Sequence, residues 1–181
     1  RTTQPTRLAM NCSGKHSGMI LTCHINGWPI DSYLSPEHPL QKAIAKEVEM
    51  MSGEAIVNTT VDGCGAPLFM FSLLGLARAV RALTISTDPV HQSVVSACRE
   101  FPEMVSGQGR LATRMMQNIE GLFMKDGAEG FNVASMPDGR TLAIKISDGT
   151  SRALPAVTAA ALKILGVDAK EIEENTYGGG K

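Results

Sequence analysis

The chain has 181 residues, of which 43% are hydrophobic, 19% are charged and only 4% are aromatic. This composition supports a packed core and argues against an intrinsically disordered chain. Seventeen Lys and Arg residues against eighteen Asp and Glu residues leave a net charge of −1, so no basic field indicates nucleic-acid binding. No uncharged apolar run reaches about 18 residues, so no membrane span is expected.

The first half of the chain predicts helices and one short strand. A glycine-containing loop leads into a helix that ends at Gly27. Apolar residues at helical spacing, with charges between them, predict an amphipathic helix over 40–51. Residues 54–61 alternate loosely before Asp62-Gly63, which predicts a strand followed by a turn. The strongly apolar segment 68–83 predicts a buried helix.

The second half predicts two helices, a three-stranded meander and a closing helix. The Thr87-Asp88-Pro89 sequence is a typical helix start, and a further helix is expected over 110–120. Short apolar or alternating runs separated by Asp-Gly turns predict antiparallel strands at 122–125, 131–136 and 141–147. An Ala- and Leu-rich helix over 153–165 follows.

These elements predict an α+β fold with helices packed on an antiparallel sheet. Residues 1–181 are expected to form a single domain, because this length is typical of one. Residues 167–181 are acidic and then glycine-rich, which is typical of a tail.

Two segments place a cysteine beside a glycine-rich turn: Cys12 within 11–16, and Cys64 within 62–65. Gly14-Lys15 partly matches a phosphate-binding loop, but that motif needs a glycine where Ala9 stands. A second interpretation is a metal site of Cys12, His16 and Cys64, because thiolates and nitrogen suit zinc. A third is a cysteine nucleophile with a histidine base. The simplest alternative is a pair of reduced thiols packed as small apolar side chains.

Lys125 stands at the end of a predicted strand, before the turn Asp126-Gly127. A lysine at a turn is usually solvated, and its functional interpretation is a partly desolvated amine that serves as a base or proton shuttle.

Taken together, these segments resemble the bacterial L-asparaginase II family, the Rhizobium-type inducible asparaginases. The resemblance rests on four motifs in the family's order and covers about residues 8–165. The motifs are Asn-Cys-Ser-Gly-Lys-His-Ser-Gly-Met at 11–19, Val-Asp-Gly-Cys-Gly-Ala-Pro at 61–67, Glu-Met-Val-Ser-Gly-Gln-Gly-Arg at 103–110 and Lys-Asp-Gly-Ala-Glu-Gly at 125–130.

The resemblance implies hydrolysis of L-asparagine to L-aspartate and ammonia, and a fold similar to the serine β-lactamase and glutaminase superfamily. It implies a zinc ion held by Cys12, Lys15 and Cys64, with His16 beside the site and not a ligand. A lysine must lose a proton to bind a metal, so zinc affinity is expected to fall at low pH. Asp62 is implied near metal and substrate, with Ser13, Gly14 and His16 as further substrate-binding residues.

The same resemblance implies that Lys125 works with catalytic serines, one of them in a Ser-x-x-Lys turn that this sequence does not contain. In the family that turn lies upstream of the Asn-Cys-Ser-Gly-Lys motif. We therefore expect the chain to be the C-terminal part of a longer asparaginase, with Arg1 as a cut within it, and to be inactive alone.

The expected partners are L-asparagine and a second copy in a homodimer, in the cytoplasm of a bacterium. Three alternatives stay open. The chain is a zinc-stabilised interaction module without activity, a glutaminase-like amidase, or a cysteine amidase that uses Cys12. Side-chain length of the substrate is judged by pocket shape, so the sequence does not separate asparagine from glutamine.

Overall fold

The computed structural model describes residues 6–7 and 10–169. The chain divides into two compact units, the first comprising Arg1–Met50 and Glu54–Phe71, and the second Met51–Gly53 and Ser72–Lys181. The predicted α+β class is confirmed, because the described residues form seven helices and two small antiparallel sheets. Among these helices none has the length and apolarity that crossing a membrane requires. The single domain and the likeness to the β-lactamase superfamily stay predictions.

The first unit is built from two helices and a hairpin. It contains α1 (Ser13–Asn26), most of α2 (Pro39–Ser52) and the antiparallel pair β1 (Asn58–Val61) and β2 (Pro67–Met70). The chain leaves α1 at Gly27, as the sequence predicts, and the N–H of Gly27 bonds to helix carbonyl groups.

The predicted helix over 68–83 is wrong in its first part. Residues Pro67–Met70 form strand β2, which pairs with β1 so that Leu68 lies opposite Thr60, and α3 (Leu73–Ile85) begins only after Ser72. The Ser72 hydroxyl accepts a hydrogen bond from the N–H of Gly75 and so caps α3. A short apolar strand and the apolar start of a helix have no difference in periodicity, which is why the sequence merges them.

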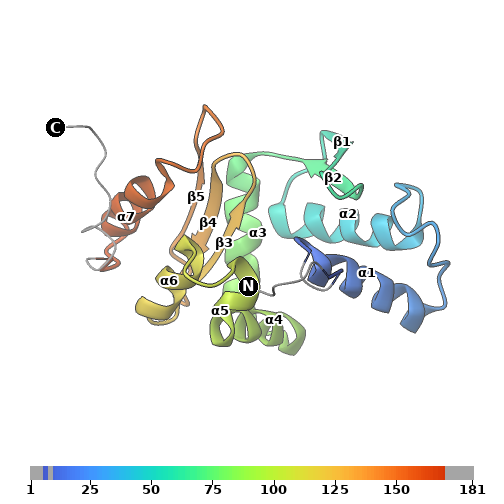
Figure 1. The fold of residues 1–181 in the computed structure, drawn as a ribbon, viewed down its shortest axis with the longest axis horizontal. Coiled ribbons are helices and arrows are strands. Elements are labelled where there is room, and N and C mark those ends of the chain that lie inside the picture. The colour runs from blue at the N-terminus through green and yellow to red at the C-terminus, as the bar shows by residue number, and fades with distance from the viewer. Residues whose placement is uncertain (1–5, 8–9, 170–181) are drawn as a thin grey trace. The chain divides into compact units, whose positions relative to one another are not determined.

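The second unit holds the remaining elements (Figure 1). After α3 come α4 (Pro89–Glu100) and the unpredicted five-residue helix α5 (Pro102–Ser106). Helix α6 (Leu111–Asn118), the meander β3 (Phe123–Gly127), β4 (Phe131–Ser135) and β5 (Thr141–Lys145), and helix α7 (Leu154–Ile164) follow. The strand order β3-β4-β5 confirms the predicted meander.

The meander is covered on both faces, because successive residues of a strand point to opposite sides. Asn132 and Ala134 of β4 face α7, where the Asn132 amide donates to the hydroxyl of Thr158. Ser135 faces α3, where its hydroxyl lies 2.6 Å from that of Thr84. Figure 1 shows the resulting layers, with α6 and α7 on one side of the sheet and α3 on the other.

The core of the second unit lies between the sheet, α6 and α7, and it extends into the predicted tail. Val167 and Ala169 are buried in this core with Met115, Met124 and Leu162. The rest of the predicted tail, 170–181, lies outside the described residues.

Candidate functional site

Helix α1 presents three candidate residues on one face, because Cys12, Lys15 and His16 are three and four positions apart. Cys12 immediately precedes the helix and has a left-handed backbone, with φ 65° and ψ 10°. Residues with a side chain rarely adopt this conformation, and where they do it is often at a functional site. The carbonyl of Cys12 accepts the N–H of His16 at 3.1 Å, so the strained residue begins the helix.

The turn between β1 and β2 is organised by Asp62. One of its carboxylate oxygens, Oδ1, accepts the N–H of Cys64 at 2.8 Å and the N–H of Ala66 at 3.0 Å. The backbone of Asp62 also donates to the carbonyl of Ala66 at 2.9 Å. These bonds explain why Asp-Gly-Cys-Gly forms a tight turn, and they fix the backbone from which the Cys64 thiol projects.

The fold brings this turn against the start of α1, all within the first unit. Lys15 Nζ donates to the second carboxylate oxygen of Asp62, 47 positions along the chain. The side chains of Cys12 and Cys64 are also joined by a hydrogen bond. The structure therefore places together four predicted residues from two separate motifs: Cys12, Lys15, Asp62 and Cys64.

The charges of this cluster shift the pKa of three of its members. Burial by itself would lower the pKa of the Lys15 amine, but the hydrogen bond and charge of Asp62 outweigh it and raise that pKa. The hydrogen bond from Lys15, helped by two backbone N–H groups, lowers the pKa of Asp62. The hydrogen bond with Cys12, followed by a smaller effect of desolvation, raises the pKa of the exposed Cys64 thiol. Without a metal the cluster is thus a lysine–carboxylate ion pair beside a thiol that resists ionisation.

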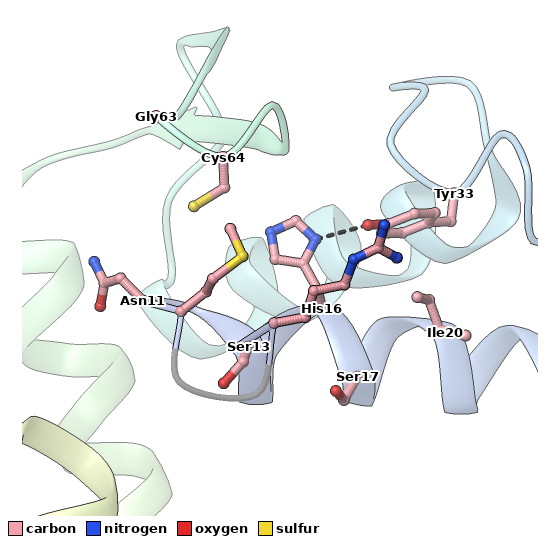
Figure 2. A pocket seen from close by; sticks show the side chains of 10 residues that line it. Asn11, Ser13, His16, Ser17, Ile20, Tyr33, Gly63 and Cys64 are labelled. Atoms are coloured by element: carbon pink, nitrogen blue, oxygen red, sulfur yellow. Dashed lines mark hydrogen bonds between the residues drawn. The ribbon is translucent and has the colours of Figure 1, made fainter. Parts of the chain in front are cut away.

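A pocket of about 740 Å³ opens beside this cluster, and every residue that lines it belongs to the first unit. Its walls combine polar, apolar and sulfur-containing side chains: Arg7, Met10, Asn11, Ser13, His16, Ser17, Ile20, Tyr33, Gly63 and Cys64. Figure 2 shows Cys64 extending from the β1–β2 turn toward the residues of α1. The predicted residues Ser13 and His16 therefore share one cavity with a predicted metal ligand.

Histidine 16 has a partner that the sequence does not predict. Its Nδ1 lies 2.7 Å from the hydroxyl of Tyr33, which comes from the loop between α1 and α2. This bond occupies one ring nitrogen of His16 and leaves the other, Nε2, without a part in it. In the described part of the chain no three His, Cys, Asp or Glu side chains form a group able to hold a metal. No periodicity or motif marks Tyr33, so only the fold reveals it.

Lys125 lies in the second unit, on β3, where it faces the same side of the sheet as Val133. Its side chain is 52% exposed, and its amine donates to the backbone carbonyl of Asp126. The Asp126 carboxylate lies 3.4 Å from that amine and accepts the hydroxyl of Ser106 at 2.9 Å. Burial raises the pKa of the nearby Cys98 thiol, an effect that the charge of Lys125 opposes.

Comparison with known proteins gives one family. No curated protein matches the chain. The family model described as L-asparaginase II matches residues 1–178, and so spans both units and all four motifs. At the level of the family, the activity is that of an asparagine amidohydrolase. The chain belongs to the L-asparaginase II family.

Proposed function

We propose that this chain supplies the metal and substrate pocket of an enzyme that hydrolyses L-asparagine to L-aspartate and ammonia. The observation that carries the proposal is the cluster of Cys12, Lys15, Asp62 and Cys64 beside an open pocket in a member of this family. Two motifs that are far apart in sequence meet in one place, which a pair of unrelated buried thiols does not require.

In this proposal Cys12, Cys64 and Lys15 hold a zinc ion. The donor set fits, since two thiols already in contact and an amine within reach of their charge are sulfur and nitrogen ligands that zinc prefers. When bound, the ion supplies a fixed positive charge that organises the pocket. Lys15 must give up its proton to solvent on binding, because an ammonium group has no lone pair.

The remaining residues bind and orient the substrate. Ser13 and His16 line the pocket, and Gly14 lies between Ser13 and Lys15 in the first turn of α1. Asp62 bonds to both Lys15 on α1 and the N–H of Cys64 in the β1–β2 turn, so it fixes these two segments relative to each other.

Lys125 is the proposed proton-transfer residue for the catalytic serines. Its amine contacts only oxygen atoms of Asp126 among the hydrogen bonds of the described residues, and its side chain is half exposed. These 181 residues contain no Ser-x-x-Lys sequence, so in this proposal the attacking serine lies outside them. The serine would attack the side-chain amide carbon, the C–N bond would break to release ammonia, and water would hydrolyse the resulting acyl-enzyme to aspartate.

Metal analysis combined with an ammonia-release assay tests the proposal. We expect the purified 181-residue chain to bind about one zinc ion, Cys12→Ser and Cys64→Ser to lose it, and Cys98→Ser to retain it, because Cys98 lies in the second unit. Unchanged zinc in both ligand variants would remove the metal site. We expect no ammonia from L-asparagine or L-glutamine, and measurable turnover would refute the missing-nucleophile argument. The expected homodimer, cytoplasmic location and bacterial origin stay predictions, and sedimentation equilibrium tests the first.

A further inference from the structure

Tyr33 occupies an unusual position in the pocket wall. It is half-buried, it lines the cavity, and its ring meets that of His16 edge to face, with centroids 5.9 Å apart and planes at 88°. Its hydroxyl lies 2.7 Å from His16 Nδ1, and Figure 2 shows this bond as the link between α1 and the following loop. The only polar group of the Tyr33 side chain is therefore directed at one ring nitrogen.

The loop holds Tyr33 through its backbone. Gln41, 1% exposed on α2, donates its amide N–H to the carbonyl of Tyr33 at 2.8 Å. The buried His38 donates from Nε2 to the carbonyl of Pro29 at 2.8 Å and accepts the N–H of Leu40 through Nδ1. The backbone of Tyr33 is thus held by a bond that does not involve its hydroxyl.

The direction of the hydrogen bond between Tyr33 and His16 decides which nitrogen of His16 carries the hydrogen. A phenol is a good donor, and a neutral imidazole has one N–H and one lone pair. When Tyr33 donates to Nδ1, the hydrogen of His16 resides on Nε2. In Figure 2 the second ring nitrogen lies on the side of the ring away from Tyr33, and in this tautomer it is an N–H donor.

The same pocket contains one cationic side chain among its lining residues, Arg7. A guanidinium and an N–H donor in the wall of one cavity match a carboxylate, whose oxygens only accept hydrogen bonds. The substrate of the proposed function has one carboxylate, on its α-carbon. We propose that Tyr33 is a positioning residue that holds His16 with its hydrogen on Nε2, and that His16 and Arg7 form the subsite for this α-carboxylate. The inference rests on the proposed function for the identity of the ligand.

The first test is independent of any ligand. The chain has four histidines, so long-range 1H–15N spectra of the uniformly labelled protein resolve each ring. We expect His16 to show a hydrogen on Nε2 in the native chain and a mixed or reversed tautomer in Tyr33→Phe. Phenylalanine keeps the ring, and the Gln41 bond to the backbone remains. Thr22→Val, which also removes one hydroxyl that bonds within α1, is the control and leaves the tautomer unchanged.

The second test uses L-aspartate, the product, as the probe. We expect Tyr33→Phe and Arg7→Gln each to raise its dissociation constant about tenfold, the size of one charge-assisted hydrogen bond. L-asparaginamide, in which the α-carboxylate is an amide, should have the same dissociation constant for the native and variant chains, because it lacks the carboxylate that the subsite binds.

The outcomes separate the inference from the proposed function. An unchanged His16 tautomer in Tyr33→Phe overturns the positioning role, whatever binds. Native binding of L-aspartate with unchanged affinity in both variants overturns the subsite and leaves the proposed function standing. A native chain that binds neither L-aspartate nor L-asparagine contradicts the proposed function and the subsite together, while the spectra still decide the role of Tyr33.

Discussion

Asp62 is predicted to stabilise the first unit through two separable effects, its turn and its charge. Replacement by alanine removes the acceptor for the N–H groups of Cys64 and Ala66 and breaks the ion pair with Lys15. Replacement by asparagine keeps an oxygen at the Oδ1 position and removes only the charge. Asp62→Ala should therefore cost more free energy of unfolding than Asp62→Asn.

The magnitudes follow from the geometry. Each lost turn bond costs about 1 kcal/mol net, and the ion pair adds about 0.2–1 kcal/mol because both side chains are partly exposed. We expect a loss of about 2–3 kcal/mol for Asp62→Ala and about 0.5–1 kcal/mol for Asp62→Asn. With an m-value of about 1 kcal/mol/M for a unit of this size, the alanine variant unfolds at a urea concentration about 2–3 M lower.

The single tryptophan of the chain is a probe of the correct unit. Trp28 lies directly after α1, where its N–H bonds to the carbonyl of Cys23 at 2.9 Å and its ring packs edge to face on His38. Urea titrations of the metal-free chain, followed by this fluorescence, measure the change. Asp31→Ala, an exposed aspartate of the same unit, is the matched control and should shift stability by less than about 0.5 kcal/mol. Equal losses for the alanine and asparagine variants would refute the turn argument.

Two further predictions concern the second unit, and urea unfolding followed by circular dichroism measures both. The N–H of Arg140, followed by the Arg140 side chain, lowers the pKa of Asp138 below its ordinary 3.8. The charge of Asp138 therefore stabilises the fold fully above about pH 3.8, and this stabilisation is lost as the pH falls through the lowered pKa. The difference in free energy of unfolding between the native chain and Asp138→Ala should vanish in strong acid. A difference that persists at every pH would contradict this prediction. Gly130→Ala should cost about 3 kcal/mol or more, because the added Cβ would lie 2.6 Å from the carbonyl oxygen of Thr150 and φ is +67°. Gly149→Ala, with φ +74° and its nearest neighbour at 3.7 Å, should cost only the backbone strain of about 1–2 kcal/mol, and equal losses would show that the clash is relieved.

The sequence predicts the parts of the fold that depend on local signals. The helix end at Gly27, the capped start of α4 at Asp88 and the strands of the meander all carry such signals, and all are present. The predicted turn at Asp126-Gly127 is wrong, because both residues belong to β3 and pair with β4, and the chain turns only after Gly127. The sequence merges strand β2 with α3 because a short strand and the start of a helix have the same apolar composition over four residues. The predicted burial of this helix is wrong, since only Gly75 and Thr84 of α3 are buried and Leu73 and Leu74 are exposed. Helix α5 is too short to show a period.

The candidate site divides in the same way. The residues Cys12, Lys15, Asp62 and Cys64 stand out in the sequence because each lies in a motif, and the family match covers them. Their meeting is a tertiary event with no local signal. Tyr33 is the clearest example of a site residue that the sequence does not predict. A single tyrosine in a loop carries no local signal, and its contact with His16 of α1 exists only in the folded chain.

The two oxygens of Asp62 give the cluster a property that neither motif has alone. Oδ1 is used entirely by the turn, so the direction of Cys64 is set within the hairpin before any contact with α1. Oδ2 then binds Lys15, whose place on α1 is set by helix geometry relative to Cys12. One carboxylate thus joins two locally determined pieces, and the two thiols meet as a consequence. An asparagine at position 62 keeps the hydrogen bonds of the turn and weakens only the interaction with Lys15. Zinc content and Trp28-monitored stability should therefore respond differently to Asp62→Asn, with the metal lost more readily than the fold.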